Sequence, residues 1–220
     1  GETPRLRPVL AFQRSPLAVA GVIVAGLATA SYRMVGPLYG AEVGLTPAQI
    51  GLFLACFVGG GALAQYPAGW LADRFDRRYV LIALSFVSLF ACAFSATAQG
   101  PQMVMIASAV FGFVTFPIFS VASAHAHDFA GDDERVELSA ALIFFYAVGA
   151  IAAPVVASRV IDVLGPPGFF AFIAIGHTGL AIYGLWRMTR RATVEDKTPY
   201  VYAPRTSFTI GRLMKRLRDR

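Results

Sequence analysis

The chain has 220 residues, of which 56% are hydrophobic and only 15% are charged, and its mean hydropathy is +0.60. This composition excludes an ordinary soluble domain and indicates a protein that lies in a lipid bilayer. Residues 187–220 hold ten basic and three acidic residues and account for the net charge of +6, so residues 1–186 offer no basic face for nucleic acid.

The predicted elements follow one another as three regions. Residues 1–15 form a polar lead with three arginines, which we expect to be cytoplasmic. Residues 16–186 contain six apolar stretches, each close to the 20 or so residues that a helix needs to cross a hydrocarbon core of about 30 Å. The stretches are Pro16–Tyr39, Pro47–Leu71, Tyr79–Ala98, Gln102–Ala124, Leu138–Leu164 and Phe169–Trp186. They are apolar all round for twice the length of a barrel strand, so we predict an all-α membrane domain.

The third region, residues 187–220, is predicted to be a basic cytoplasmic tail. From Thr206 onward its apolar residues recur at helical spacing among arginines and lysines, as in a helix that lies on an anionic leaflet. A disordered, solvated tail is the alternative.

Local signals mark two helix boundaries. Thr46 followed by Pro47 and Gln49 predicts a helix that starts with a capping box. The Gly165–Gly168 segment, which reads Gly-Pro-Pro-Gly, predicts a stop between the last two spans.

Arginine and lysine positions predict the orientation, because cytoplasmic segments near the membrane collect these residues. The lead, the second-to-third connection, the fourth-to-fifth connection and the tail hold seventeen of them, and the opposite side holds only Arg159. Both termini are therefore expected in the cytoplasm.

The second-to-third connection carries a motif. It reads Gly69-Trp70-Leu71-Ala72-Asp73-Arg74-Phe75-Asp76-Arg77-Arg78. Three arginines there could merely satisfy the orientation rule, but Asp73 within a basic turn is more than that rule requires. The segment resembles the G-x-L-a-D-r-x-G-r-r signature of the major facilitator superfamily, which lies between the second and third helices of a six-helix half. Gly69, Leu71, Asp73, Arg74, Arg77 and Arg78 agree with the signature, whereas Asp76 stands where it has glycine.

Other segments extend the resemblance. Gly149 and Pro154 are similar to the glycine-and-proline pattern of the family's fifth helix, with Ala153 replacing a second glycine. The Ala124–Asp128 junction and the Ala203–Ser207 segment resemble the YcaD-like branch of bacterial facilitators, specifically its C-terminal half.

The resemblance implies a fold and a function. The fold is the six-helix half of a facilitator, built as two inverted three-helix repeats, with residues 1–15 linking it to an N-terminal half. The function is secondary transport of a small solute by alternating access in the bacterial inner (plasma) membrane. The expected partners are the bilayer, the solute and the missing N-terminal six-helix half; no cofactor and no enzymatic activity are expected.

Polar residues at membrane depth are the candidates for a substrate cavity. Arg33, the only charge well inside a span, either extends to the outer headgroups or faces a central cavity and attracts an anionic group. The remaining candidates could equally be satisfied by neighbouring helices. They are Tyr32, Gln65, Tyr66, Thr115, Ser120 and Tyr146.

Two other classes of protein remain as alternatives. A haem or redox protein would need paired ligands, but His125 and His127 lie on opposed helix faces and His177 is in the sixth span. We therefore predict no metal site and no catalytic residues, and we expect Cys56 and Cys92 to be small packing residues. A membrane scaffold or receptor that transports nothing could have a similar bundle.

Overall fold

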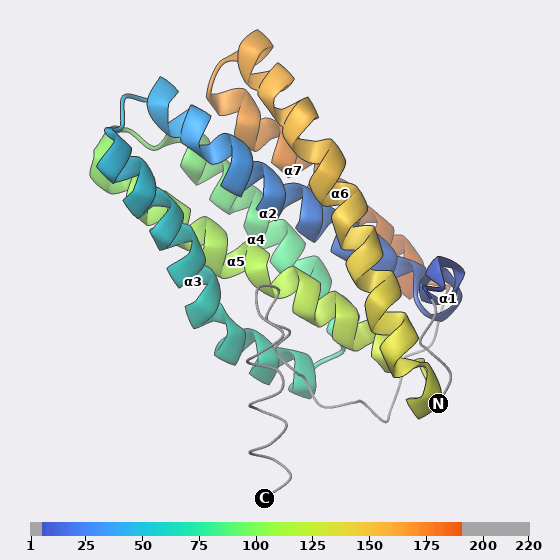
Figure 1. Cartoon of the computed structure of the whole chain (residues 1–220). Coiled ribbons are helices and arrows are strands. Elements are labelled where there is room, and N and C mark those ends of the chain that lie inside the picture. The colour runs from blue at the N-terminus through green and yellow to red at the C-terminus, as the bar shows by residue number, and fades with distance from the viewer. Residues whose placement is uncertain (1–5, 191–220) are drawn as a thin grey trace, which may run out of the picture.

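The computed structural model describes residues 6–190, so the predicted tail helix and the Ala203–Ser207 segment lie outside the described residues. Within this range the chain forms a short helix, six long helices and one 3-10 turn (Figure 1). These are α1 (Pro8–Arg14), α2 (Pro16–Glu42), α3 (Pro47–Arg74), α4 (Arg77–Thr97), α5 (Gly100–His127), η1 (Asp132–Glu134), α6 (Arg135–Leu164) and α7 (Pro167–Met188).

The all-helical prediction is confirmed: α2 to α7 are each long and apolar enough to cross a membrane. Most helices extend beyond their predicted apolar stretch by a few residues, such as Asp73 and Arg74 at the end of α3 and Arg135 at the start of α6. Counting apolar residues misses these turns because backbone hydrogen bonding continues into the aqueous layer, where charged side chains are solvated.

Both predicted boundaries are confirmed. The Thr46 hydroxyl accepts a hydrogen bond from the Gln49 N–H at 3.3 Å, and the Gln49 side chain accepts from the Thr46 N–H at 2.9 Å. After α6, Gly165 adopts a φ of 77°, a left-handed conformation that favours glycine. Pro167 then starts α7.

Helix α1 was not predicted within the lead. It has only seven residues, which is too short to be stable alone. Leu10 and Ala11 are buried against the long helices, and the Phe12 ring packs edge-on against Phe145 of α6 at 4.9 Å. Tertiary contacts therefore hold this helix, and the local sequence alone would not.

The bundle has two layers. In the view of Figure 1, α2, α3, α5 and α6 form the near layer, and α4 and α7 lie behind them. The strongest pairings are α3 with α5, α2 with α6, and α4 with α7. Helices α2–α4 form a first triplet and α5–α7 a second. The middle helix of each triplet packs on the first helix of the other: α3 packs on α5, and α6 packs on α2.

Glycines allow the two near-layer pairs to approach closely. A Cβ on Gly26 would lie 2.1 Å from the Tyr146 carbonyl oxygen, and a Cβ on Gly149 would lie 2.2 Å from that of Ile23. The α3–α5 pair repeats this arrangement. There a Cβ on Gly60 would lie 2.0 Å from the Ala109 carbonyl oxygen, and a Cβ on Gly112 would lie 1.9 Å from the Phe57 carbonyl oxygen. The glycines thus form two pairs, Gly26 with Gly149 and Gly60 with Gly112. Each glycine packs against the carbonyl group of the residue three positions before the other member of its pair, as expected for two repeats of one packing unit.

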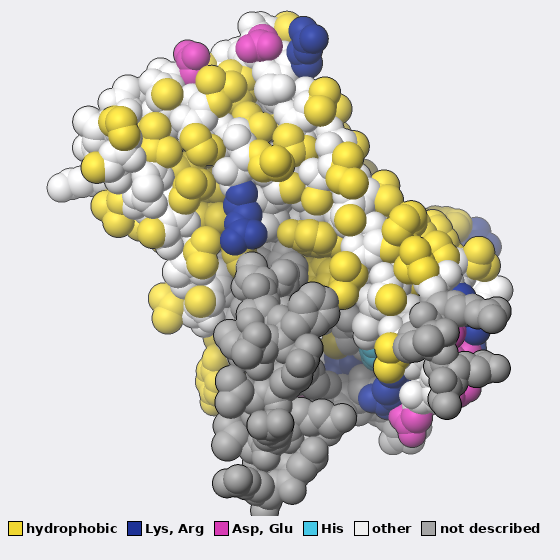
Figure 2. All heavy atoms as spheres, viewed as in Figure 1, with side chains coloured by type: hydrophobic (Ala, Val, Ile, Leu, Met, Phe, Trp, Pro, Cys, Tyr) yellow, Lys and Arg dark blue, Asp and Glu magenta, His cyan; other side chains and the backbone are white. Residues whose placement is uncertain are grey.

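The interior contains two apolar clusters, one of which is aromatic. Tyr32 stacks on Phe53, Phe57 and Phe111 with ring centroids 5.0, 4.2 and 4.8 Å apart. Large apolar side chains also cover the outside of the spans, for example Phe90 on α4 and Ile182 on α7, as a lipid environment requires. Figure 2 shows that hydrophobic side chains also lie over the middle of the near layer.

Candidate functional site

Arg77 is the centre of a buried charge cluster where α3, α4 and α5 meet. It occupies the first turn of α4, and its side chain is only 1% exposed. Its guanidinium donates to the Ala72 and Ala124 carbonyl oxygens at 3.2 and 2.9 Å. It also pairs with Asp128 at 2.7 Å and with Asp73 at 3.1 Å. We call Asp73, Arg77 and Asp128 the charge cluster; it ties the end of α5 to the α3–α4 turn.

The two carboxylates differ in exposure. The side chain of Asp128 is 4% exposed, whereas that of Asp73 is 48% exposed. Asp128 therefore compensates the positive charge of Arg77 inside the protein, whereas Asp73 is the member of the charge cluster that reaches the surface. Gly69, also in the motif, is buried near the end of α3, and Leu71 is exposed.

Asp76, which departs from the signature glycine, has a local structural role. It precedes α4 as its N-cap and accepts a hydrogen bond from the Arg78 backbone N–H at 3.0 Å. Its carboxylate also pairs with the Arg78 guanidinium at 2.7 Å. Arg74 instead lies over the Trp70 ring, 4.3 Å from its centroid.

A second group of ion pairs at the same end of the bundle fastens α1 to the start of α6. Arg14 donates two hydrogen bonds to the Glu134 carboxylate, one of them at 2.8 Å, and Arg7 pairs with Glu137 at 3.0 Å. The hydrogen bond from Arg14 lowers the pKa of Glu134, and the same bond raises the pKa of Arg14.

This ion pair predicts a pH dependence for α1. Because the pKa of Glu134 is lowered in the folded protein, its contribution is present above the ordinary glutamate pKa of about 4.3 and is lost as pH falls through the lowered value. We expect α1 to be docked at pH 7 and to dock less tightly in acid. Spin labels at Gln13→Cys and Val136→Cys, in a background without native cysteines, should report a broader distance distribution at pH 3 than at pH 7. Glu134→Gln should weaken docking at pH 7; identical distributions at both pH values would contradict the prediction.

The membrane-depth candidates lie in different places. Arg33 is exposed on α2, where it lines a cavity of about 500 Å³ with Leu54, Ala55, Phe57 and Val58 of α3. A second cavity, of about 560 Å³, lies between α2 and α6. Its lining is Ala30, Met34, Ile143, Tyr146, Ala147, Ala150, Ile151, Pro154 and Val155.

Ala30, Arg33 and Met34 have helical spacing and form one stripe of α2, with a cavity on each side. We call this stripe and the two cavities the α2 face. Figure 2 shows one basic side chain in the middle of the near layer, with hydrophobic side chains near it.

Tyr32, the neighbour of Arg33, points the other way. It is fully buried, and its hydroxyl donates to Ser108 at 2.8 Å, which in turn donates to the Phe53 carbonyl at 2.7 Å. These bonds connect α2, α5 and α3. The placement does not support a cavity role for Tyr32, which instead holds the bundle together.

The other candidates are also dispersed. Thr115 and Ser120 are buried on α5, and Thr115 donates to its own helix at the Phe111 carbonyl. Gln65 of α3 donates to the Gly61 carbonyl at 3.2 Å, and Tyr66 is 83% exposed. The structure thus brings only Arg33 and Tyr146, of the seven candidates, to the α2 face.

The histidines are separate. His125 and His127 lie in the last turn of α5, where His127 contacts Ser139 of α6 at 3.0 Å. His177 is buried within α7, and neither ring nitrogen has a partner among residues 6–190.

Sequence reasoning missed Asp128 as the partner of Arg77 because the two are distant in the chain.

Comparisons with known proteins agree with this fold. Residues 18–218 match the family described as the Major Facilitator Superfamily. An uncharacterized MFS-type transporter of Yersinia pestis (strain Pestoides F) is 30% identical over 193 residues, which are 88% of this chain and 48% of that protein. The MFS-type transporter YcaD of Escherichia fergusonii is 30% identical over 155 residues, or 70% of this chain and 39% of that protein. The chain therefore spans about half, or less, of the length of these relatives.

Two solved structures show the same architecture. The POT family transporter PepTSo superposes with a TM-score of 0.68 at 16% identity, covering 99% of this chain and 46% of that one. An auto-inhibited POT family peptide transporter superposes with a TM-score of 0.66 at 16% identity, covering 87% of this chain and 39% of that one. The six helices thus match half of a facilitator fold, and together with the family match over residues 18–218 this means that the chain belongs to the major facilitator superfamily.

Proposed function

We propose that this chain is the C-terminal six-helix half of a secondary transporter that moves a small solute by alternating access across a bacterial inner membrane. The observation that carries the proposal is the α2 face. It is hollowed on both sides of α2, is apolar apart from Arg33 and Tyr146, and belongs to the layer opposite α4 and α7. Such a face fits one wall of a solute passage, with the N-terminal half as the other wall.

The glycine contacts support movement of this half as one body. Close packing of α2 on α6 and of α3 on α5 leaves little freedom for helices to slide within the half. Pro37, Pro117 and Pro154 each weaken a backbone hydrogen bond within a spanning helix, which provides places to bend.

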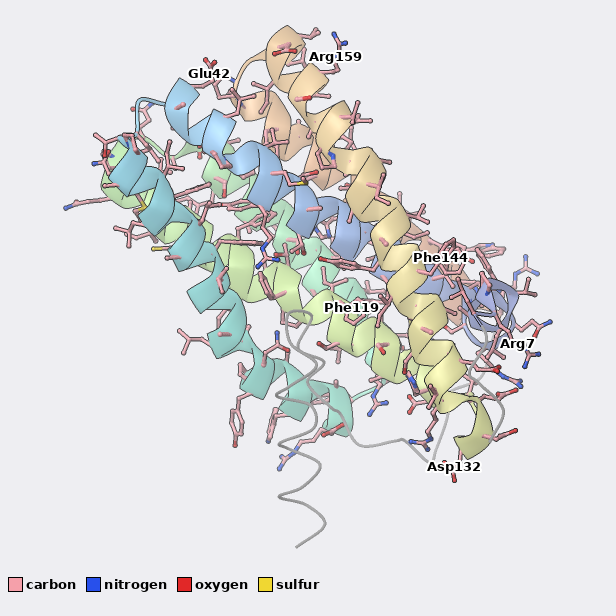
Figure 3. All side chains as sticks on the ribbon, viewed as in Figure 1. Arg7, Glu42, Phe119, Asp132, Phe144 and Arg159 are labelled. Carbon is pink, nitrogen blue, oxygen red and sulfur yellow. The ribbon has the colours of Figure 1, made fainter. Side chains whose placement is uncertain are left out.

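The arginine distribution supports an orientation. Arg7 and Asp132 lie at one end of the bundle, and Glu42 and Arg159 lie at the other (Figure 3). The first end also holds Arg14, the charge cluster and Arg78. Because cytoplasmic segments collect arginine, we assign the first end to the cytoplasm. The charge cluster would then help to close the cytoplasmic side of the passage, with Asp73 reaching toward the other half.

Asp73→Asn tests this gating role. The change keeps the size of the side chain but removes the charge that pairs with Arg77 at the surface. We expect solute uptake to slow about five-fold or more while insertion and thermal stability change little. Asp162→Asn, an exposed carboxylate near the other end, is the matched control. An unchanged uptake rate in Asp73→Asn would contradict a role in gating.

Solute counterflow in liposomes that contain the full-length protein tests the proposed function itself. A transporter exchanges labelled solute across the membrane with saturable kinetics, and a scaffold or receptor does not. Saturable exchange supports the proposal; binding without exchange for every bound solute overturns it.

A further inference from the structure

The charge of Arg33, which has no partner among the described residues, suggests what the passage carries. Arg33 has no hydrogen-bond or ion-pair partner among residues 6–190, and it lies nine residues before the end of α2, or about 14 Å along the helix. The acidic residues of this part of the chain all lie near helix ends or in connections, from Glu42 at the end of α2 to Asp162 in the last turn of α6. Among residues 6–190, therefore, no carboxylate lies at the depth of Arg33.

The surroundings of Arg33 would make a charge there costly without a counter-charge. The cavity beside it is lined by Leu54, Ala55, Phe57 and Val58, none of which carries a polar side-chain atom. An arginine in such a place is retained when an anion pairs with it, since the planar guanidinium binds a carboxylate through two parallel hydrogen bonds.

The second cavity limits the shape of the anion. Ala30 and Met34 lie three residues before and one residue after Arg33, so the two cavities adjoin across one stripe of α2. The second cavity is apolar except near Tyr146, and its volume of about 560 Å³ is in the range of small-molecule pockets. A molecule with its charged group at Arg33 can place an apolar body against α6.

We propose that the cargo is an amphipathic organic anion, with its carboxylate on Arg33 and its aliphatic or aromatic body in the cavity between α2 and α6. The inference rests on the proposed function, of which it specifies the substrate class. It also assigns Arg33 as the residue that discriminates anions from neutral analogues.

Matched ligands test the proposal on the purified full-length protein in neutral detergent. The probes are octanoate, 3-phenylpropionate and longer aryl carboxylates, each compared with its neutral amide, and binding is read from concentration-dependent thermal stabilisation. We expect the carboxylates to bind about tenfold or more tightly than the amides. Arg33→Gln should abolish this preference, Arg33→Lys should retain part of it, and Arg159→Gln, an exposed arginine of α6 that lines neither cavity, should leave it intact.

Several results would overturn the inference. They are equal binding of acids and amides, an unchanged preference in Arg33→Gln, or no Arg33-dependent binding of any acid in the series. Arg33-dependent stabilisation by phosphatidylglycerol alone would identify the occupant as a lipid and would also overturn it. Because Arg33 has no partner in the described residues and its charge is costly there without an anion, Arg33→Gln should melt at or above the wild-type temperature without ligand, which excludes misfolding as the cause.

Counterflow separates this inference from the proposed function. Acids that bind through Arg33 but are never exchanged would leave the anion site standing and overturn transport. Saturable exchange of neutral or cationic solutes that is unaffected by Arg33→Gln would leave transport standing and overturn the anion site.

Discussion

Arg77→Met is expected to lower the free energy of unfolding of the six-helix bundle by about 3–5 kcal/mol. The guanidinium is 1% exposed and pairs with Asp128, which is 4% exposed, so its loss removes the cation that pairs with this buried carboxylate. It also leaves the Ala72 and Ala124 carbonyl oxygens without this donor. Unfolding by a denaturing detergent titrated into mixed micelles, followed by tryptophan fluorescence, would measure the loss.

Two variants make this prediction specific. The double variant Arg77→Met with Asp128→Leu removes both charges and should be less destabilised than the single variant. The side chain of Arg7 is 56% exposed, and Arg7→Met breaks its ion pair with Glu137. This change should alter the unfolding free energy by less than about 1 kcal/mol. Equal losses in Arg77→Met and Arg7→Met would show that the charge cluster contributes no more than a surface pair.

The second large effect is expected for Gly60→Ala. The new Cβ would lie 2.0 Å from the Ala109 carbonyl oxygen, a separation that atoms cannot adopt, so α3 and α5 would have to move apart. Overpacking of this kind costs about 1–3 kcal/mol and sometimes more. Gly149→Ala, at 2.2 Å from the Ile23 carbonyl oxygen, should have a similar effect on the α2–α6 pair.

Two glycines without close neighbours supply control variants for these substitutions. At Gly59 of α3 and Gly179 of α7 an added Cβ would have no neighbouring atom within 4 Å, so alanine at either site meets open space. Alanine also favours a helix over glycine by about 1 kcal/mol, so these two variants should be neutral or slightly stabilised. Destabilisation of all four variants alike would contradict a specific close approach at Gly60 and Gly149.

Much of the fold could be predicted because hydrophobic length and chain breaks are local properties. An apolar run of about 20 residues has to be a helix in lipid, where every backbone group needs a partner within its own segment. Thr46 with Gln49 caps a helix by contacts that span only three residues. The charge motif could likewise be recognised, because the residues that resemble the family signature all lie within the ten-residue segment Gly69–Arg78.

The site was less predictable because these helices are apolar all round. On such a helix the sequence does not say which side faces lipid, a neighbour or a cavity. Tyr32 and Arg33 are adjacent polar residues, yet one is buried among aromatic rings and the other is exposed on the α2 face. Leu54 and Met34 resemble lipid-facing residues, and only the packing of α3 and α6 around α2 places them beside cavities.

The sequence by itself determined that this chain crosses a membrane as six helices, where several of them begin and end, and which connection carries the charge motif. Only the tertiary structure decided that Asp128 completes the Arg77 cluster, that α1 docks on α6, and that four glycines bring two helix pairs into contact. The physical reason is distance along the chain. Hydrophobicity and capping act within a few residues, whereas burial and charge pairing depend on helices that meet only after the bundle has packed.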